Sequence, residues 1–224
     1  LPVRRQDEIF KHWVQPFLDR DTRVCVIVSD AMRYEIGEEL LSLIRREDRY
    51  GTELQPALAM LPSYTQLGMA ALLPHKKLEI TDNDQAGVLV DGVSSQGTIN
   101  RNKILSQALG GHGQAMKAED FMRLNRDESR EVLKANRVLY LYHNRIDHTG
   151  DKLQSQGLAF DAAEETLTDI VQLVKKLTAA NASNILVTAD HGFIYQNREL
   201  AESDFLAANV ASDKVLFRNR RFLL

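Results

Sequence analysis

The sequence predicts an α/β fold, in which a mostly parallel central sheet carries helices on both faces. The first observation is a set of three continuous apolar runs, at residues 23–28, 138–143 and 184–189. Runs without polar alternation are typical of strands that are buried on both faces. The second observation is an amphipathic helical pattern over residues 163–177, between the last two runs. A strand, a long helix and a strand in that order predict a right-handed crossover between parallel strands.

Weaker patterns predict the remaining elements. A packing helix over residues 5–18 opens the chain, and a second helix begins near Ala31. A third helix covers residues 63–73, where Pro74 ends it. Residues 75–118 contain many Asp, Asn, Gly and Ser residues and a short helical pattern. This composition predicts an insert or cap over a site, with a variable surface loop as the alternative.

Composition bounds the class of protein. The chain has 224 residues, of which 44% are apolar and 26% charged, with a net charge of −3. These values fit a single domain over residues 1–224, which we expect to be a fragment of a longer protein. This net charge argues against a protein whose whole surface binds nucleic acid, but it does not exclude a local basic groove. The single cysteine, Cys25, favours a cytoplasmic setting, and no apolar run reaches the roughly 20 residues of a membrane helix.

Each predicted strand leads into a polar cluster that contains an aspartate. Asp30 follows the first run, Asp147 lies just beyond the second, and Asp190 and His191 follow the third. Because ligands collect at the carboxyl ends of parallel strands, we expect the three carboxylates to converge on one edge of the sheet. Carboxylates at close range repel one another unless a cation lies between them. Aspartate and histidine ligands suit zinc or manganese.

Taken one at a time, these residues have simpler structural interpretations. Asp30 or Asp190 alone would cap the following helix, and His191 alone would be a surface or hydrogen-bonded side chain. Asp147 and Asp151 are four residues apart, so they would face one metal from a single turn or form an exposed polar turn. The coincidence of three strand ends favours a metal site over these alternatives.

Four segments, taken in order, resemble the motifs of the PglZ domain family, a branch of the alkaline phosphatase superfamily. They span residues 24–193 and read Ser29-Asp30-Ala31-Met32-Arg33-Tyr34-Glu35, Leu61-Pro62-Ser63-Tyr64-Thr65, Ile146-Asp147-His148-Thr149-Gly150-Asp151 and Thr188-Ala189-Asp190-His191-Gly192-Phe193. Asp-His-Gly alone is a weak motif, whereas all four segments in order are specific. The resemblance implies an alkaline phosphatase-like fold and a place in the BREX-type systems by which bacteria resist bacteriophage.

The resemblance also implies a two-metal phosphoester hydrolase with Thr65 at the nucleophile position. A threonine hydroxyl is a weak nucleophile until a metal stabilises its alkoxide, and a second metal would stabilise the leaving oxygen. The residues implied for the first metal are Asp30, Thr65, Asp190 and His191, and those for the second are Asp147 and Asp151. Zinc is the expected metal, with manganese or magnesium as alternatives. A helix N-cap is the structural alternative for Thr65, and Ser63 is a rival for either role.

Two departures from the superfamily pattern keep a second interpretation open. Asp151 stands where the superfamily commonly has histidine, and no histidine follows His191. The leading interpretation is a phosphatase or phosphodiesterase that works with other proteins of a phage-defence system, with nucleic acid as a candidate substrate. The alternative is a catalytically impaired module of the same system that binds and assembles partners.

Overall fold

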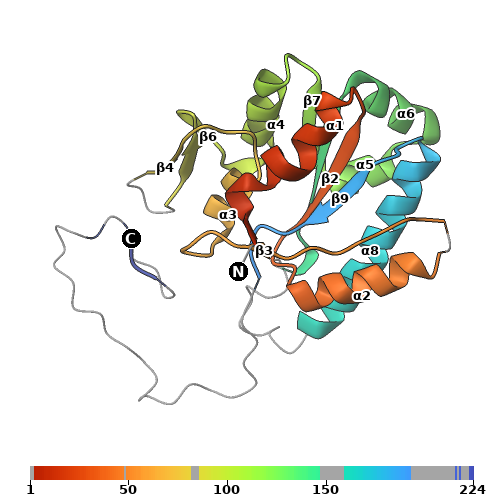
Figure 1. The fold of residues 1–224 in the computed structure, drawn as a ribbon, viewed down its shortest axis with the longest axis horizontal. Helices are drawn as coiled ribbons and strands as arrows, with labels where there is room; N and C mark the ends of the chain where they lie inside the picture. Colours follow the sequence, from red (N-terminus) through yellow and green to blue (C-terminus); the bar gives the residue numbers. More distant parts are fainter. Residues whose placement is uncertain are drawn as a thin grey trace.

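The computed structural model describes residues 3–47, 49–81, 86–146, 159–192, 215, 217 and 222–224. Within them, four parallel strands form a central sheet in the order β7-β8-β2-β9. These strands are β7 (Gly113–Lys117), β8 (Val138–His143), β2 (Val24–Ser29) and β9 (Ile185–Thr188). Helices cover both faces of the sheet (Figure 1). The predicted α/β fold is confirmed, as are the three strands that the apolar runs indicated.

Every residue of β2 is buried because alternate side chains enter two separate cores. Val24, Val26 and Val28 belong to one hydrophobic cluster, whereas Cys25 and Ile27 belong to the other. Successive side chains of a strand point to opposite faces, so a strand between two helical layers is apolar throughout. Cys25 is thus a core side chain, and burial raises the pKa of its thiol to about 12.

Helices from different parts of the chain cover each core. The helices on the first face are α1 (Gln15–Asp19), α3 (Thr65–Ala71) and α4 (Gly97–Ala108). Those on the second face are α2 (Tyr34–Arg45), α5 (Ala118–Arg123), α6 (Arg126–Ala135) and α8 (Ala159–Ala179). The predicted crossover helix over residues 163–177 is confirmed by α8. Its buried side chains include Leu167, Ile170 and Leu177, as the helical period indicated.

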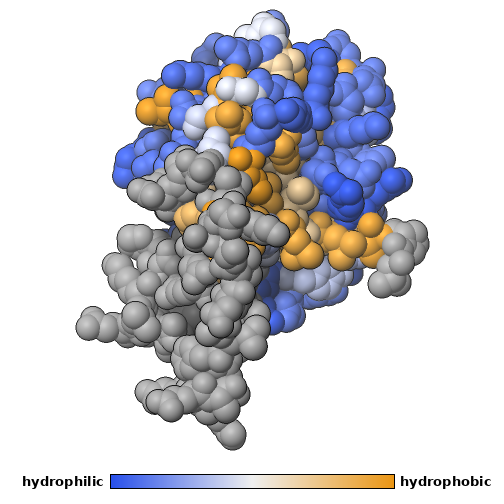
Figure 2. All heavy atoms as spheres, turned by 90° about the vertical axis from the view of Figure 1, so that its left-hand side faces the viewer, coloured by the Kyte–Doolittle hydropathy of each residue, from blue (hydrophilic) through white to orange (hydrophobic). Residues whose placement is uncertain are grey.

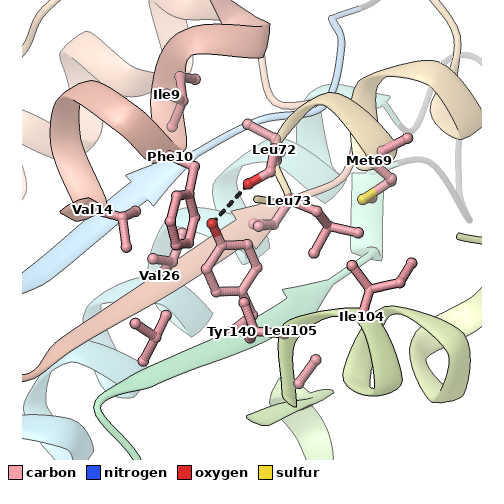
Figure 3. Close-up of a cluster of buried hydrophobic side chains, with 14 of the residues drawn as sticks. Ile9, Phe10, Val14, Val26, Met69, Leu72, Leu73, Ile104, Leu105 and Tyr140 are labelled. Atoms are coloured by element: carbon pink, nitrogen blue, oxygen red, sulfur yellow. Dashed lines mark hydrogen bonds between the residues drawn. The ribbon is translucent and has the colours of Figure 1, made fainter. Parts of the chain in front are cut away.

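Tyr140 on β8 connects the first core to α3 (Figure 3). Its ring is fully buried, and its hydroxyl donates a hydrogen bond of 2.7 Å to the carbonyl oxygen of Leu72. Leu72 is the C-cap residue of α3, where carbonyl groups have no partner within the helix. One bond therefore satisfies both a buried hydroxyl and a helix end, and it fixes α3 against the sheet.

The opening helix predicted over residues 5–18 is confirmed as a helical segment over residues 6–19, but it is not a regular α-helix throughout. A 3-10 helix η1 (Gln6–Glu8) and a π-helix η2 (Phe10–Val14) precede α1. Pro16 has no N–H to donate, and its ring crowds the carbonyl four residues earlier, which explains the wide turn. Trp13 still packs against the first core, and its indole N–H donates to Gln55 Oε1 at 3.2 Å.

Residues 75–118, predicted as an insert or cap, contain two kinds of structure. A small antiparallel sheet is formed by β4 (Leu78–Ile80), β5 (Val88–Val90) and β6 (Val93–Ser94). In contrast, α4 and β7 belong to the central layers. The role of this range as a cap stays a prediction. Among the described residues, no helix combines the length and apolar character needed to cross a membrane.

Candidate metal centre and nucleophile

The carboxyl ends of β2 and β9 bring three predicted ligands together. Val28 pairs with Thr188 in the parallel register, so Asp30 and Asp190 follow their strands at the same edge. Asp30, Asp190 and His191 are all buried, and one ligand atom of each lies within 4.8 Å of the others. The next helix, α2, has Arg33 as its N-cap, so Asp30 does not cap it. Convergence at the sheet edge, rather than helix capping, accounts for the position of Asp30.

The backbone holds Asp190 through one of its carboxylate oxygens. Its Oδ1 accepts hydrogen bonds from the N–H groups of Ala31, at 3.1 Å, and His191, at 2.8 Å. Its Oδ2 is buried and has no hydrogen-bond partner among the described residues. Burial raises the pKa of this carboxyl to about 6, although the two N–H groups lower it. A buried oxygen of this kind is available to a cation.

Ala31 reaches Asp190 through an unfavourable backbone conformation. Its φ is 61°, in the left-handed region that residues with a Cβ rarely adopt. That conformation costs about 1 kcal/mol in an L-residue, so the surroundings must hold it. The preceding residue is also fixed, because the Asp30 N–H donates to the carbonyl of His143 at 2.7 Å. The turn after β2 is therefore tied to both neighbouring strands.

His191 presents Nε2 to the cluster. Its Nδ1 lies 2.7 Å from the Gly192 carbonyl oxygen, so in the neutral imidazole Nδ1 carries the proton and Nε2 keeps a lone pair. Nε2 lies 2.9 Å from Thr65 Oγ1 and 3.5 Å from both Asp30 Oδ1 and Asp190 Oδ2. In this tautomer the Thr65 hydroxyl donates to Nε2. The same lone pair is the one that a metal would use.

Thr65 is the first residue of α3, and its hydroxyl faces His191 instead of the helix backbone. The N-cap of α3 is Tyr64, which makes no side-chain cap bond. The alternative of Thr65 as a helix N-cap is therefore wrong. Ser63, the rival for the nucleophile, is exposed, whereas Thr65 is half-buried at the cluster. This placement favours Thr65.

Gly68 allows α3 to approach the turn after β9. A Cβ at this position would lie 2.1 Å from the Asp190 carbonyl oxygen and 2.7 Å from its carbonyl carbon. Both are backbone atoms, which cannot move aside as a side chain can. Gly68 is three residues after Thr65, so its close contact sets the separation between the Thr65 hydroxyl and His191.

Gln6 is a buried polar residue that sequence reasoning missed. Its amide nitrogen donates to the carbonyl oxygens of Ala189, at 2.9 Å, and Asp190, at 2.6 Å. Its Oε1 accepts from the Met60 N–H at 3.1 Å. The adjacent strands β1 (Arg4–Arg5) and β3 (Ala57–Leu58) pair in parallel and bring these segments together. Gln6 thus joins the turn after β9 to the segment that leads to Thr65.

The surface near this segment is partly apolar. Leu58 is 54% exposed and Leu61 is 86% exposed, just before Thr65 in the chain. On the face that carries α3 and the small sheet, hydrophobic surface lies between hydrophilic regions (Figure 2). The segment before Thr65 is therefore not the uniformly basic surface expected of a groove built only for phosphate backbones.

The second predicted group, Asp147 and Asp151, lies outside the described residues, and its role stays a prediction. The end of β8 before it is described. There, His143 Nε2 lies 3.1 Å from Asp169 Oδ2 on α8. Burial lowers the pKa of this imidazole. His143 therefore makes a structural contact with α8 rather than joining Asp30 and Asp190.

The donor set of the described cluster fits one divalent cation. It offers two carboxylates and an imidazole nitrogen, with a hydroxyl hydrogen-bonded to that nitrogen. Two buried carboxylates so close together are unfavourable without a positive charge between them. Mixed oxygen and nitrogen donors of this kind suit zinc, and also manganese.

Asp190 gives the metal-free protein a specific pH dependence. Its pKa is about 6 in the folded protein, against an ordinary value of 3.8, so the folded state binds the proton more tightly. The contribution of Asp190 to the free energy of unfolding therefore increases as the pH falls through 6 toward 4. We expect the free energy of unfolding of wild type, relative to Asp190→Asn, to rise by about 1 kcal/mol between pH 7.5 and pH 5. Urea unfolding in the presence of a chelator measures it, and equal pH dependence in the two proteins would contradict the assignment.

A parallel α/β sheet with an Asp, Asp-His and Thr cluster at its carboxyl edge has the architecture of an alkaline phosphatase-like domain. Residues 9–224 match the family described as the BREX system PglZ alkaline phosphatase-like domain. The chain belongs to this PglZ family.

Two curated relatives agree with this assignment. The chain is 38% identical over 225 residues to the alkaline phosphatase-like protein BrxZ of Escherichia coli O9:H4 (strain HS). It is 40% identical over 223 residues to the alkaline phosphatase-like protein PglZ of Bacillus cereus (strain H3081.97). Each alignment covers 99% of this chain and 26% of the relative, so the chain spans about a quarter of the length of these proteins.

Proposed function

We propose that this domain is a metal-dependent phosphoester hydrolase of a bacterial phage-defence system, with Thr65 as its nucleophile. The observation that carries the proposal is the 2.9 Å contact between Thr65 Oγ1 and His191 Nε2, beside the carboxylates of Asp30 and Asp190. A hydroxyl beside donors that suit a divalent cation supports this role for Thr65. Membership of the PglZ family supports the same chemistry.

In the proposed reaction, the Thr65 hydroxyl gives its proton to water, its oxygen forms a bond to phosphorus, and the bond between phosphorus and the ester oxygen breaks as the leaving oxygen takes up a proton. Water then attacks the phosphorus of the phosphothreonine ester, the bond between phosphorus and Thr65 Oγ1 breaks, and Oγ1 takes up a proton to restore the hydroxyl. Asp30, Asp190 and His191 would hold a divalent cation, proposed to be zinc, which supplies stabilisation of the threonine alkoxide when bound. Gly68 and Gln6 hold Thr65 and the 190–191 turn in position. We also propose that Asp147 and Asp151 are ligands of a second metal.

The substrate class follows from the same proposal. A phosphodiester of nucleic acid suits a phage-defence protein, and we propose other proteins of that system as partners. Both depend on the family and not on the surface charge of this domain.

The direct test is hydrolysis of bis(p-nitrophenyl) phosphate by the purified protein. We expect turnover with added zinc or manganese, and a loss to background when a chelator removes the metal. Asp190→Asn should remain near background at every metal concentration tested. A wild-type protein that binds metal but does not hydrolyse this ester or an oligonucleotide would instead support the alternative, a catalytically impaired assembly module.

A further inference from the structure

A buried arginine near the same sheet edge has no role in the chemistry above. Arg101 lies in the first half of α4 and is 7% exposed. Its Nε donates to the Ser95 carbonyl oxygen at 3.0 Å. In the part of the chain that the structure describes, no carboxylate forms an ion pair with its guanidinium. Arg101 is therefore a buried cation whose charge no described acid balances.

The ring of Tyr142, near the end of β8, lies beneath this guanidinium. The Arg101 Cζ is 4.7 Å from the ring centroid, which is the geometry of a cation–π contact. The Tyr142 hydroxyl is buried and has no hydrogen-bond partner of ordinary geometry among the described residues. One carbonyl and one ring leave most of the five guanidinium donors unused. The guanidinium thus has hydrogen-bonding capacity that the described residues do not use.

The pair lies on the same side of the sheet edge as the candidate metal centre. Tyr142 pairs with Val28, one residue before Ser29 and two before Asp30. The C-terminal end of α4 leads into the start of β7, so its N-terminal half, with Arg101, lies toward the carboxyl edge. Burial is the main reason that the pKa of Tyr142 is raised to about 12; the charge of Arg101 and a hydrogen bond with it act to lower this pKa, and the Asp190 charge acts to raise it. Both charges therefore act on the Tyr142 hydroxyl.

We propose that Arg101 and the Tyr142 hydroxyl form a binding subsite for the non-bridging oxygens of a phosphate group, next to Thr65, Asp190 and His191. A guanidinium offers paired N–H donors that match two phosphate oxygens, and a phenol adds one more. The anion would supply the counter-charge that Arg101 lacks, which explains why a charged side chain is kept in this buried position. The inference rests on the proposed function and names the residues that hold its substrate.

The test uses inorganic phosphate as the probe, so it does not require turnover. Phosphate binding to the metal-loaded protein is measured by calorimetry for wild type, Arg101→Met and Tyr142→Phe. Methionine keeps much of the length of arginine and packs well, so Arg101→Met should unfold at the same urea concentration as wild type or a higher one. We expect the phosphate Kd to rise at least tenfold in Arg101→Met and about threefold in Tyr142→Phe. The KM for bis(p-nitrophenyl) phosphate should rise by similar factors.

A purely structural role for Arg101 gives the opposite pattern. Arg101→Met would then unfold at a lower urea concentration, while folded protein kept the wild-type phosphate Kd, and that result would overturn the proposal. Failure of the hydrolase proposal is separate, because it would show as absent turnover in a wild-type protein whose phosphate binding still depends on Arg101. If Tyr142→Phe kept the wild-type phosphate Kd, the Tyr142 hydroxyl would not be part of the subsite.

Discussion

Thr65→Ala is expected to lower kcat for phosphodiester hydrolysis by roughly 10³-fold or more, because it removes the atom that forms the bond to phosphorus. Metal content should stay at the wild-type level, because Asp30, Asp190 and His191 are untouched. Folding should change little, since Thr65 is half-buried and its hydroxyl does not cap α3. Stopped assays with bis(p-nitrophenyl) phosphate, together with elemental analysis of the same samples, measure both quantities.

Two control variants make this result specific. Thr65→Ser keeps a hydroxyl and should retain measurable turnover, whereas Ser63→Ala removes the exposed neighbouring hydroxyl and should retain wild-type kcat. Hydrolysis by Thr65→Ala at the wild-type rate would exclude Thr65 as the nucleophile. A loss in Ser63→Ala instead would move that role to Ser63.

Gly68→Ala is expected to disrupt both the fold and the site. The added Cβ would meet the Asp190 carbonyl oxygen at 2.1 Å, so α3 and the turn after β9 must separate. Overpacking of this kind typically costs 1–3 kcal/mol, and contact with two backbone atoms predicts about 3 kcal/mol here. The movement would also lengthen the 2.9 Å contact between Thr65 and His191. Urea unfolding and the hydrolysis assay together measure the two effects.

Gly37→Ala is the matched control, because Gly37 is also a buried glycine within a helix. Its added Cβ would meet only Leu54 Cδ1, at an ordinary 3.5 Å. Replacing a helix glycine by alanine then stabilises by about 0.5–1 kcal/mol. Similar urea midpoints for the two variants would contradict the close packing of α3 on Asp190.

The sequence was sufficient for the parts of the fold that have a strong local pattern. Strands β2 and β8 lie between two helical layers, so their side chains are apolar on both faces and the runs are continuous. The convergence of Asp30 with Asp190 and His191 followed from parallel pairing alone. In contrast, β7 has the sequence Gly-Gln-Ala-Met-Lys at the edge of the described sheet, and its apolar content is too low to mark it as a strand.

The residues that hold the cluster together could not be predicted, because their roles depend on contacts distant in the chain. Gln6 follows β1, which pairs with β3, and the hydrogen bonds of its side-chain amide reach carbonyl groups more than 180 positions away. Gly68 resembles any glycine in a helix until the Asp190 backbone is placed beside it. Arg101 gives no sign in sequence that its charge is buried over Tyr142. Local patterns therefore predict the elements, whereas tertiary contacts decide how the site is held.

Metal content tests the central claim most directly. Wild type, Asp30→Ala and Asp127→Ala would be purified in parallel with zinc present, dialysed and examined by elemental analysis. Asp127 is an exposed carboxylate on α6 and serves as the control. We predict at least one tightly bound zinc in wild type and Asp127→Ala, and its loss in Asp30→Ala. Wild-type protein without bound metal, or Asp30→Ala with the same metal content as wild type, would contradict a metal centre at the carboxyl edge of β2 and β9.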